Sequence, residues 1–557
     1  MFYLKRKVFV AVIFCFAFLF LANNFALAKA EGEQETFFVE KLYDLKQREQ
    51  VSFRLVKVSS QAYFYIESDW YLNITDQERG VINQNLASLA NDFDKEVYPK
   101  LTALWGSEWT PGIDNDSRIT IVFEQLTKGT AGYFNDANEY LKQQAPFSNE
   151  REMLYLSAEY LKGSLIKNYL AHEFTHLISF NQKDRLHGVS EDVWLSEARA
   201  EYSAGGDLGQ RINQFSQKPS DSLVIWNGEE VDYGIVAIFT QYLVEKYGEG
   251  VLSDSLHSKK TGIDSLDEAL SKAGVNKSFL QIFNDWALAV SLNSCSLGDV
   301  YCYKNSALVN LRIAPNLVVL PSTGKTNLSL NYSLSPWSSS WYRFIGSEGD
   351  LKLAFDFDPK ALFTLKYILC EIKDGCSVFD FDTDGSLKKE LTINNFSQNY
   401  LSLTLIPSVK PRFSNIATLG DAYSFSVLAQ TSNEPSQAVQ EEELIKALLA
   451  QIEQLKAQIA KVQAQLAVSR PHPSACGPRG GVVSNLYFGV RSDEVKCLQN
   501  FLISQNVYPE KIVSGYFGVL TKSAVIRFQQ KYSLNPTGDV GVLTRIKINS
   551  LLAGLLY

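Results

Sequence analysis

Alternating apolar and polar residues mark the start of the chain as a mixture of strands and a helix. Residues 51–58 and 63–66 alternate with a period of two, which is typical of half-buried strands, and 118–123 predicts another strand. Within residues 81–104, apolar side chains instead recur at the spacing that places them on one face of a helix. These side chains are Ile82, Leu86, Leu89 and Phe93. The pattern predicts an α/β part over residues 31–130.

Helical patterns return further along the chain. The runs 165–179 and 194–204 are both compatible with helices, and a third run begins near Asp232 and ends at Gly248, a residue common after helix C-termini. Before them, the short apolar run Met153–Ser157 predicts a strand. We expect these segments to complete one domain over residues 31–306.

From residue 309 to 430 the chain consists of short β-prone runs separated by Gly, Ser, Asn and Pro, which predicts a β-sandwich. Residues 380–385 begin like an EF-hand loop, but position twelve is Leu391 instead of Glu, so a hairpin turn is favoured. Asp114, Asn115 and Asp116 could either bind a calcium ion or form an Asx turn, and the turn is favoured.

A polar linker over residues 431–440 leads into a heptad pattern, and together they span 431–470. The apolar positions are Ile445, Leu448, Ile452, Leu455, Ile459, Val462 and Leu466. β-branched residues at most a positions favour a parallel two-stranded coil, which would join two chains through residues 445–466. Three heptads are marginal for a coil, so a single helical spacer packed on another surface is the alternative.

The first thirty residues resemble a targeting segment. Lys5, Arg6 and Lys7 precede an apolar run over residues 8–21, and small residues follow before position 30. The run is short for a membrane span, so residues 1–30 are predicted to be a cleaved secretory signal, with an uncleaved anchor as the alternative. No other stretch is apolar and long enough to span a bilayer, and we expect a secreted or cell-envelope protein of a bacterium.

Composition agrees with export. The chain has 557 residues, 46% of them hydrophobic and 20% charged, which is typical of several globular domains. A net charge of −8 provides no basic surface for nucleic acid. One of the seven cysteines, Cys15, lies in the signal, and an even number remains for disulfides. Other connectivities are open, but closeness in sequence suggests Cys295 with Cys302, Cys370 with Cys376, and Cys476 with Cys497.

Candidate chemistry is concentrated in the helical run 165–179, where residues 172–176 read HExxH. His172 and His176 are four residues apart and share one helix face, so their imidazoles can bind one metal ion, and zinc is the expected ion. Glu173 lies about 100° round the helix, where it can take a proton from a water that zinc has acidified. With only five histidines in the chain, a chance match at this spacing is improbable.

A catalytic zinc site takes three protein ligands, and the second helical run supplies a candidate for the third. A metzincin would have a third His where this chain has Gln182. The run 194–204 instead carries two carboxylates one turn apart. We assign Glu197 as the third ligand and Glu201 as the acceptor of a hydrogen bond from a zinc-bound imidazole.

These residues resemble the gluzincin metallopeptidases, which pair HExxH with a Glu on a following helix. The block Trp194–Ala198 is similar to the Trp-Leu-Asn-Glu-Gly block of that clan, and residues 148–153, 233–234 and 242–243 resemble its hyicolysin-like branch. The resemblance implies a zincin-like α/β catalytic domain, with Met153–Ser157 as the edge strand beside the active-site helix. It also implies a residue that donates to the oxyanion, and Tyr233 is the candidate, with a packing role as the alternative. Thermolysin-type enzymes have Asp where this chain has Glu201.

Residues 476–555 resemble the peptidoglycan-binding-like module of bacterial exported proteins. The similarity lies in the runs 494–502, 515–518 and 521–529 and in Thr537-Gly538. Apolar positions at helical spacing within the segment predict a small three-helix bundle. The resemblance implies peptidoglycan as a partner, although such modules also serve as plain folding units.

Taken together, the sequence predicts a multidomain α+β protein that hydrolyses protein or peptide substrates with a Zn²⁺ cofactor and is tethered to the cell wall. Two alternatives are open. One is a non-catalytic wall-attached scaffold with a structural metal, which would have little reason to hold Glu173 beside the metal. The other is a hydrolase of the peptides of peptidoglycan itself.

Overall fold

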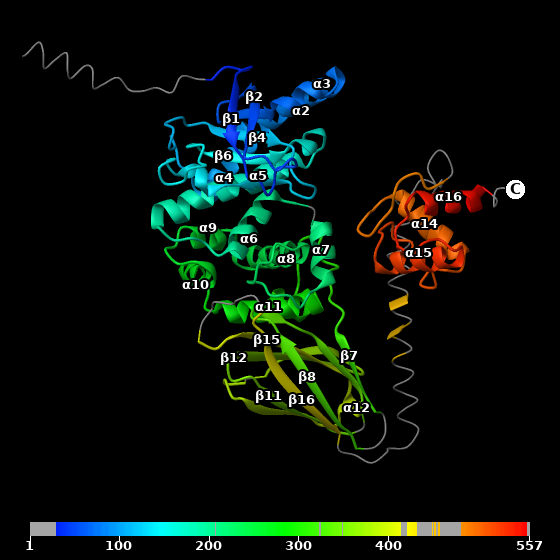
Figure 1. Ribbon diagram of the computed structural model, residues 1–557. Coiled ribbons are helices and arrows are strands. Elements are labelled where there is room, and N and C mark those ends of the chain that lie inside the picture. The colour runs from blue at the N-terminus through cyan, green and yellow to red at the C-terminus, as the bar shows by residue number, and fades with distance from the viewer. Residues whose placement is uncertain are drawn as a thin grey trace, which may run out of the picture. The chain divides into compact units, whose positions relative to one another are not determined.

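The computed structural model divides the chain into two compact units, residues 1–445 and 446–557 (Figure 1). The described residues are 29–206, 208–321, 325–347, 349–381, 383–413, 420–431, 448, 451–452, 455–456 and 481–553. Nearly all of the predicted signal, most of the linker and heptad segment, and Cys476 lie outside the described residues. Within the described part of the chain, no helix has the length and apolar character needed to cross a membrane.

The N-terminal part of the first unit contains a six-stranded sheet in the order β1-β2-β3-β4-β6-β5. Its strands are β1 (Gln34–Phe38), β2 (Gln50–Val58), β3 (Ala62–Glu67), β4 (Ile119–Glu124), β5 (Gly132–Phe134) and β6 (Met153–Ser157). β3, β4 and β6 are parallel to one another and buried along their whole length, as is usual for parallel strands covered on both faces. The strands predicted from alternation are confirmed.

The edge of this sheet corrects one expectation. Residues 153–157 were expected at the edge, but they form β6, which lies between β4 and β5. The edge strand is β5, which pairs antiparallel with β6 and places Gly132 opposite Leu156. Because β5 has three residues, it is too short to show alternation in the sequence.

Helices cover one face of this sheet. α2 (Ser68–Asn73), α3 (Asp76–Asp92), the π-helical turn η1 (Phe93–Val97) and α4 (Tyr98–Trp105) include the helix predicted over 81–104. α3 begins earlier than predicted because Thr75 and Glu78 form a capping box. α5 (Ile166–Phe180), continued by η4 (Asn181–Arg185), packs beside them through Phe174, whose ring lies 5.2 Å from Phe93 and 5.4 Å from Tyr98. α5 is thereby held between the sheet and the helices that follow it.

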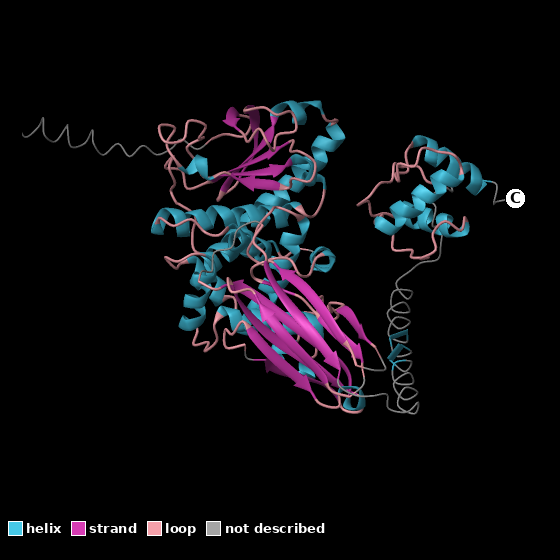
Figure 2. Ribbon diagram, turned by 60° about the horizontal axis from the view of Figure 1, so that its bottom comes forward, coloured by secondary structure: helices cyan, strands magenta, loops and turns pink. Residues whose placement is uncertain are grey.

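A second group of helices lies between this layer and the β-sandwich (Figures 1 and 2). It comprises α6 (Val193–Ala204), α7 (Leu208–Gln217), α8 (Glu230–Tyr247), α9 (Gly250–Leu256), α10 (Gly262–Lys272) and α11 (Phe279–Leu292). The short 3₁₀ helices of the unit are η2 (Asp136–Glu139), η3 (Ala158–Lys162), η5 (Cys295–Leu297) and η6 (Asp299–Tyr301). α8 ends at Gly248, which has φ 85° and donates its N–H to the carbonyl of Val244, so the predicted cap is confirmed.

The predicted β-sandwich is present as two sheets, in the orders β13-β12-β15-β10-β7 and β14-β11-β16-β8. Its strands are β7 (Asn316–Leu320), β8 (Asn327–Leu334), β9 (Ser338–Ser339), β10 (Tyr342–Gly346), β11 (Leu351–Phe357), β12 (Ala361–Glu371), β13 (Gly375–Phe381), β14 (Lys388–Ile393), β15 (Tyr400–Pro411) and β16 (Tyr423–Thr431), with α12 (Phe396–Asn399) before β15. The hairpin predicted at 380–385 is wrong. This segment connects β13 to β14, which belong to opposite sheets, and turn residues favour either connection.

Two structural details match their predictions. Asp116 donates its backbone N–H to the Asp114 side chain at 2.9 Å, so residues 114–116 form the Asx turn that enters β4. The disulfides Cys295–Cys302 and Cys370–Cys376 are formed, and Cys497 is also disulfide-bonded.

The sandwich has an apolar core of its own, which includes Leu353, Phe363 and Val427, and it also packs against the helical layer. Trp337 and Trp341 from the sandwich belong to the same apolar cluster as α11. The Trp337 ring lies 5.3 Å from that of Phe279, and the Trp341 indole donates to the carbonyl of Ala287 at 2.9 Å. The sandwich is therefore anchored to the helical layer and belongs to the first unit.

The described part of the second unit contains three helices, α14 (Asp493–Ser504), α15 (Val519–Lys531) and α16 (Val542–Ala553), around a core of its own. Two buried glutamines hold its turns. Gln499 accepts from the backbone of Gly515 at 2.9 Å, and Gln529 accepts from the backbone of Gly538 at 2.8 Å. Both glycines have positive φ, which explains the glycine at each turn. The predicted three-helix bundle is confirmed.

Candidate metal centre

The two histidines of the HExxH segment lie on one face of α5. Their ring centroids are 4.9 Å apart, as expected for residues one turn apart. The opposite face of the helix is buried in the apolar core through Leu170, Phe174 and Leu177. Core packing therefore fixes which way the imidazoles point.

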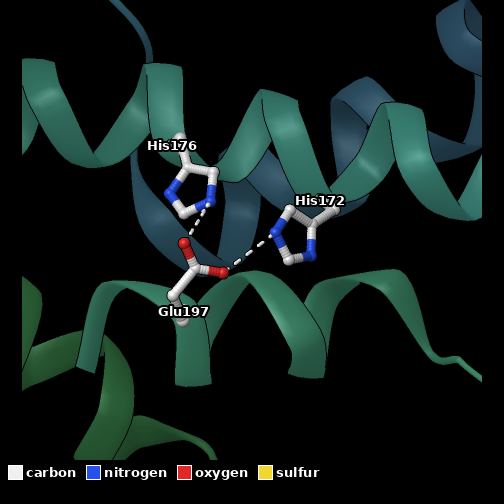
Figure 3. A group of neighbouring side chains, drawn as sticks. All are labelled: His172, His176 and Glu197. Carbon is white, nitrogen blue, oxygen red and sulfur yellow. Dashed lines mark ion pairs between the residues drawn. The ribbon is translucent and has the colours of Figure 1, made fainter. Parts of the chain in front are cut away.

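The carboxylate of Glu197 on α6 lies between the two rings (Figure 3). His172 Nε2 is 3.2 Å from Glu197 Oε2, and His176 Nε2 is 3.5 Å from Glu197 Oε1. Ligand atoms of the three residues lie within 4.8 Å of one another, and the described residues contain no second such group of three His, Cys, Asp or Glu. The structure thus brings together the three residues that the sequence selected as ligands.

The outer nitrogens of both rings also have neighbours. His176 Nδ1 is 3.1 Å from Ser196 Oγ, and His172 Nδ1 is 3.5 Å from Glu201 Oε1. Arg211 on α7 binds the Glu201 carboxylate with two hydrogen bonds of 2.7 Å, from Nε and from Nη2. Contacts of this kind orient a metal-binding imidazole and fix which nitrogen carries the proton.

Burial and charge together set the protonation of the cluster. Burial lowers the pKa of His176 to about 4, whereas at His172 the carboxylates of Glu197, Glu173 and Glu201 outweigh burial and raise the pKa to about 9. Burial opposes ionisation of Glu197, but the two histidines and Arg211 hold its pKa below the usual value. Burial raises the pKa of Glu173 to about 7, with Glu197 and Glu201 adding to the effect and His172 opposing it.

A cavity of about 370 Å³ opens onto this cluster, and its walls come from distant parts of the chain. Glu173 and Tyr233 line it together with His172, His176 and Glu197. Tyr233 is in the first turn of α8, its ring packs edge-on against Trp226 at 4.8 Å, and the Arg211 guanidinium lies 5.2 Å from the ring. The edge strand β5 forms the opposite wall.

Gly132 in β5 lies directly against Glu173. A β-carbon added at Gly132 would be 2.9 Å from Glu173 Cγ and 2.7 Å from the carbonyl oxygen of Tyr155. The absence of a side chain at position 132 therefore lets Glu173 lie between the helix and the edge strand.

The donor atoms fit a zinc ion. Two imidazole nitrogens and one carboxylate oxygen form a common set of catalytic zinc ligands, and neighbouring ligands of a tetrahedral zinc ion are separated by about 3.3 Å. Each ring nitrogen is at about that distance from one oxygen of Glu197, 3.2 Å to Oε2 for His172 and 3.5 Å to Oε1 for His176, so the carboxylate is within reach of an ion bound by both rings. Glu197 Oε2 is buried, and its close neighbour is His172 Nε2 at 3.2 Å, which balances its charge only as an imidazolium. A bound metal ion would take the place of that proton.

The comparison with known families matches the C-terminal part of the chain. Residues 491–548 match the family model described as "Putative peptidoglycan binding domain", which confirms that part of the resemblance. No curated protein matches the chain. A solved structure described as a family GH115 4-O-methyl-alpha-glucuronidase with specificity for decorated arabinogalactans is similar at 9% identity over 58% of this chain, with a TM-score of 0.12. The similar part is 53% of that protein's chain, and a likeness this weak carries no argument about fold or function.

Sequence reasoning missed three residues of the centre. Ser196, Arg211 and Gly132 contact His176, Glu201 and Glu173 respectively. Ser196 directly precedes Glu197, so its proximity was readable from the sequence. Arg211 and Gly132 lie on other elements, and no periodic pattern connects them to the HExxH segment.

Proposed function

We propose that the first unit is a zinc-dependent endopeptidase, exported and carried to the cell wall by the second unit. The observation that carries the proposal is that His172, His176 and Glu197 converge at a cavity that also contains Glu173. A metal with a purely structural role needs no base beside it and no open cavity. A bound zinc ion would polarise the scissile carbonyl group and acidify a water molecule there.

Glu173 is the general base of this proposal. Its carboxylate lines the cavity beside the three candidate ligands, where it can accept a proton from a water molecule and return it. It would take a proton from the attacking water and later deliver it to the nitrogen of the leaving amine. Gly132 keeps the carboxylate positioned by leaving space beside its Cγ atom.

Tyr233 and β5 would act on the substrate. The Tyr233 hydroxyl is the candidate donor to the oxyanion that develops at the scissile carbonyl. β5 is the edge strand of the sheet, and an extended peptide can add to such an edge by backbone hydrogen bonds. This arrangement would hold the substrate across the cavity between β5 and α6.

Two kinds of substrate fit this site. Ordinary polypeptides are our first choice because the motif order resembles that of proteases that cleave them. Peptides of the cell wall are the second choice because the chain carries a domain of a peptidoglycan-binding family. Hydrolysis of casein and of purified peptidoglycan, measured side by side, distinguishes the two.

The decisive experiment combines metal analysis with hydrolysis by purified full-length protein. We expect one zinc ion per chain, casein cleavage that a zinc chelator stops, and recovery when zinc is restored. Glu173→Gln should bind zinc like the parent and retain less than about a tenth of kcat, because the ligands stay and the base is removed. Glu159→Gln, at an exposed position after β6, is the matched control and should be fully active.

Zinc binding without hydrolysis of either substrate would support the wall-attached scaffold. Full activity of Glu173→Gln would show that another group is the base.

A further inference from the structure

A second pair of acidic side chains is buried away from the metal centre. Glu139, at the end of η2, is 4% exposed, and Glu152, directly before β6, is 2% exposed. Arg151 donates its backbone N–H to the carbonyl of Asn138 at 3.0 Å, so the two segments run side by side. The side chains of Glu139 and Glu152 lie within hydrogen-bonding reach of each other.

Glu152 is held firmly in this position. Ile113 donates its backbone N–H to Glu152 Oε1 at 3.0 Å. Gly112 has φ 85°, and a β-carbon there would be 1.8 Å from Glu152 Oε2. The loop before β4 thus closes directly over the carboxylate, and glycine is the residue that permits both the backbone conformation and the contact.

Glu139 has no such support. Both of its carboxylate oxygens are buried without a hydrogen-bond partner. Burial and the neighbouring Glu152 raise its pKa well above the usual value, and Arg185 offsets this only in part. The Arg185 guanidinium is itself stacked on the Trp109 ring at 3.9 Å. An isolated buried carboxylate is costly, so this geometry calls for a cation or a shared proton.

More acidic groups surround the pair. Asp114 raises the pKa of both glutamates, and Glu108 raises that of Glu152. Glu108 is buried, with Oε1 accepting from the Tyr98 hydroxyl at 2.8 Å and Oε2 lacking a partner. Among the described residues, neither Glu139 nor Glu152 forms an ion pair with Lys or Arg. The charges of Arg185 and Arg151 offset part of this negative charge, because they lower the pKa of Glu139 and of Asp114 respectively.

The same sheet shows how this chain compensates a buried carboxyl pair when no ion is needed. Asp44 and Glu124 are both fully buried, but Arg48 Nη2 lies 2.5 Å from Asp44 Oδ2, and Tyr133 donates to Glu124 at 3.3 Å. That pair has a guanidinium and a phenol as partners. Glu124 Oε1 is likewise buried without a hydrogen-bond partner, so the contrast with Glu139 lies in the Asp44–Arg48 ion pair and in the hydrogen bond from Tyr133.

We propose that Glu139 and Glu152 bind a calcium ion. Calcium takes oxygen ligands and tolerates bidentate carboxylates, and two carboxylates match its charge. The absence of nitrogen and sulfur donors argues against zinc at this place.

The ion would brace the wall of the cavity. Glu139 and Glu152 lie at the two ends of the connection between β5 and β6, so a shared ion ties the edge strand to its neighbour. This inference does not depend on the proposed peptidase activity, because calcium binding would stabilise the fold whether or not the metal centre is catalytic.

The test uses the full-length chain, stripped of metals and restored with one equivalent of zinc, then titrated with CaCl₂ by calorimetry. We expect one calcium ion per chain, a higher Tm with CaCl₂, and a smaller effect of MgCl₂. Glu139→Gln should weaken calcium binding by at least about tenfold, because a charged ligand is lost. Glu159→Gln, the exposed control, should bind calcium like the parent, and zinc content should be equal in all three proteins.

Absence of calcium binding by the parent protein would overturn the proposal, as would equal affinity in Glu139→Gln. A shared proton predicts a different result. Because the pKa of Glu152 is raised to about 7 in the folded state, stability without calcium should fall as pH rises from its ordinary value of 4.5 through 7. If CaCl₂ fails to reverse that fall, the pair holds a proton and no ion. The parent protein alone decides this point, even if Glu139→Gln fails to fold.

Discussion

The metal centre of the first unit and the glutamine-held turns of the second unit both bury polar side chains, but they do so in opposite ways. Gln529 is 1% exposed, and its amide donates to Thr537, Asp539 and Thr544 while its oxygen accepts from Gly538. Every hydrogen bond of that side chain is made within the fold. At the metal centre, Glu197 Oε2 is buried without a hydrogen bond.

This difference distinguishes buried polar residues that stabilise the fold from buried polar residues that are available to bind a ligand. A fully bonded buried amide repays its desolvation and fixes the turns around it. A cluster of unsatisfied donor atoms destabilises the protein until something binds. The glutamine arrangement also occurs twice, at Gln499 and at Gln529, which indicates a role in the fold of the domain.

The largest expected effect comes from removing the unsatisfied carboxylate. Glu197→Ala should lose zinc and hydrolysis together, because only two protein ligands remain. Glu201→Ala should lose zinc affinity by a smaller factor, roughly 10- to 100-fold, because it acts through His172. Zinc content and casein hydrolysis measure both. As a control for folding, metal-free Glu197→Ala should unfold at nearly the same temperature as the metal-free parent. If Glu201→Ala loses zinc and Glu197→Ala keeps it, then Glu201 is the ligand and Glu197 is the residue that orients His172.

Tyr233→Phe tests a residue that lines the cavity without contacting the metal cluster directly. If its hydroxyl donates to the oxyanion, kcat should fall by roughly 10²-fold with zinc content unchanged. The packing of the ring against Trp226 would be preserved in this variant. An unchanged rate would assign Tyr233 to packing alone.

Gln529→Leu tests the other side of the comparison. Losing the bonds to Gly538 and Thr544 should lower the free energy of unfolding of the second unit by about 1–3 kcal/mol, with no change in hydrolysis. Gln530→Leu, at the adjacent exposed position, is the matched control and should have little effect. Calorimetric unfolding of the full-length chain measures both variants, and equal transitions would show that the buried amide does not hold the turns.

The smallest expected effect on catalysis comes from removing the whole second unit. Each unit has its own apolar core, so a chain that ends at residue 445 should fold and keep its kcat/KM on a soluble peptide. This end point retains Thr431, the last residue of β16. Binding to purified peptidoglycan sacculi should be lost. Equal sacculus binding by the short and full-length chains would contradict the tether, and a loss of peptide hydrolysis would show that the second unit contributes to the catalytic structure.

The sequence by itself determined the local elements and the candidate ligands of the proposed metal site. Spacing within α5 placed His172 and His176 on one face, and two carboxylates one turn apart on α6 identified Glu197 and Glu201. Alternation located β2 and β3, the run 118–123 located β4, and the C-terminal pattern located the three-helix bundle. Such patterns predict local structure because one face of a helix or strand is buried, so apolar residues recur along the sequence with the period of that element.

Only the tertiary structure decided how those elements meet. It placed β5 at the edge of the sheet, packed Trp337 and Trp341 of the sandwich against α11, and connected β13 to β14, which belong to opposite sheets. It also brought Arg211 to Glu201, Gly132 to Glu173, and Glu139 to Glu152. These contacts join residues on different elements through packing and loop paths, which have no period along the chain. For that reason the sequence could identify the candidate metal ligands but not the residues that orient them, balance their charge and enclose them.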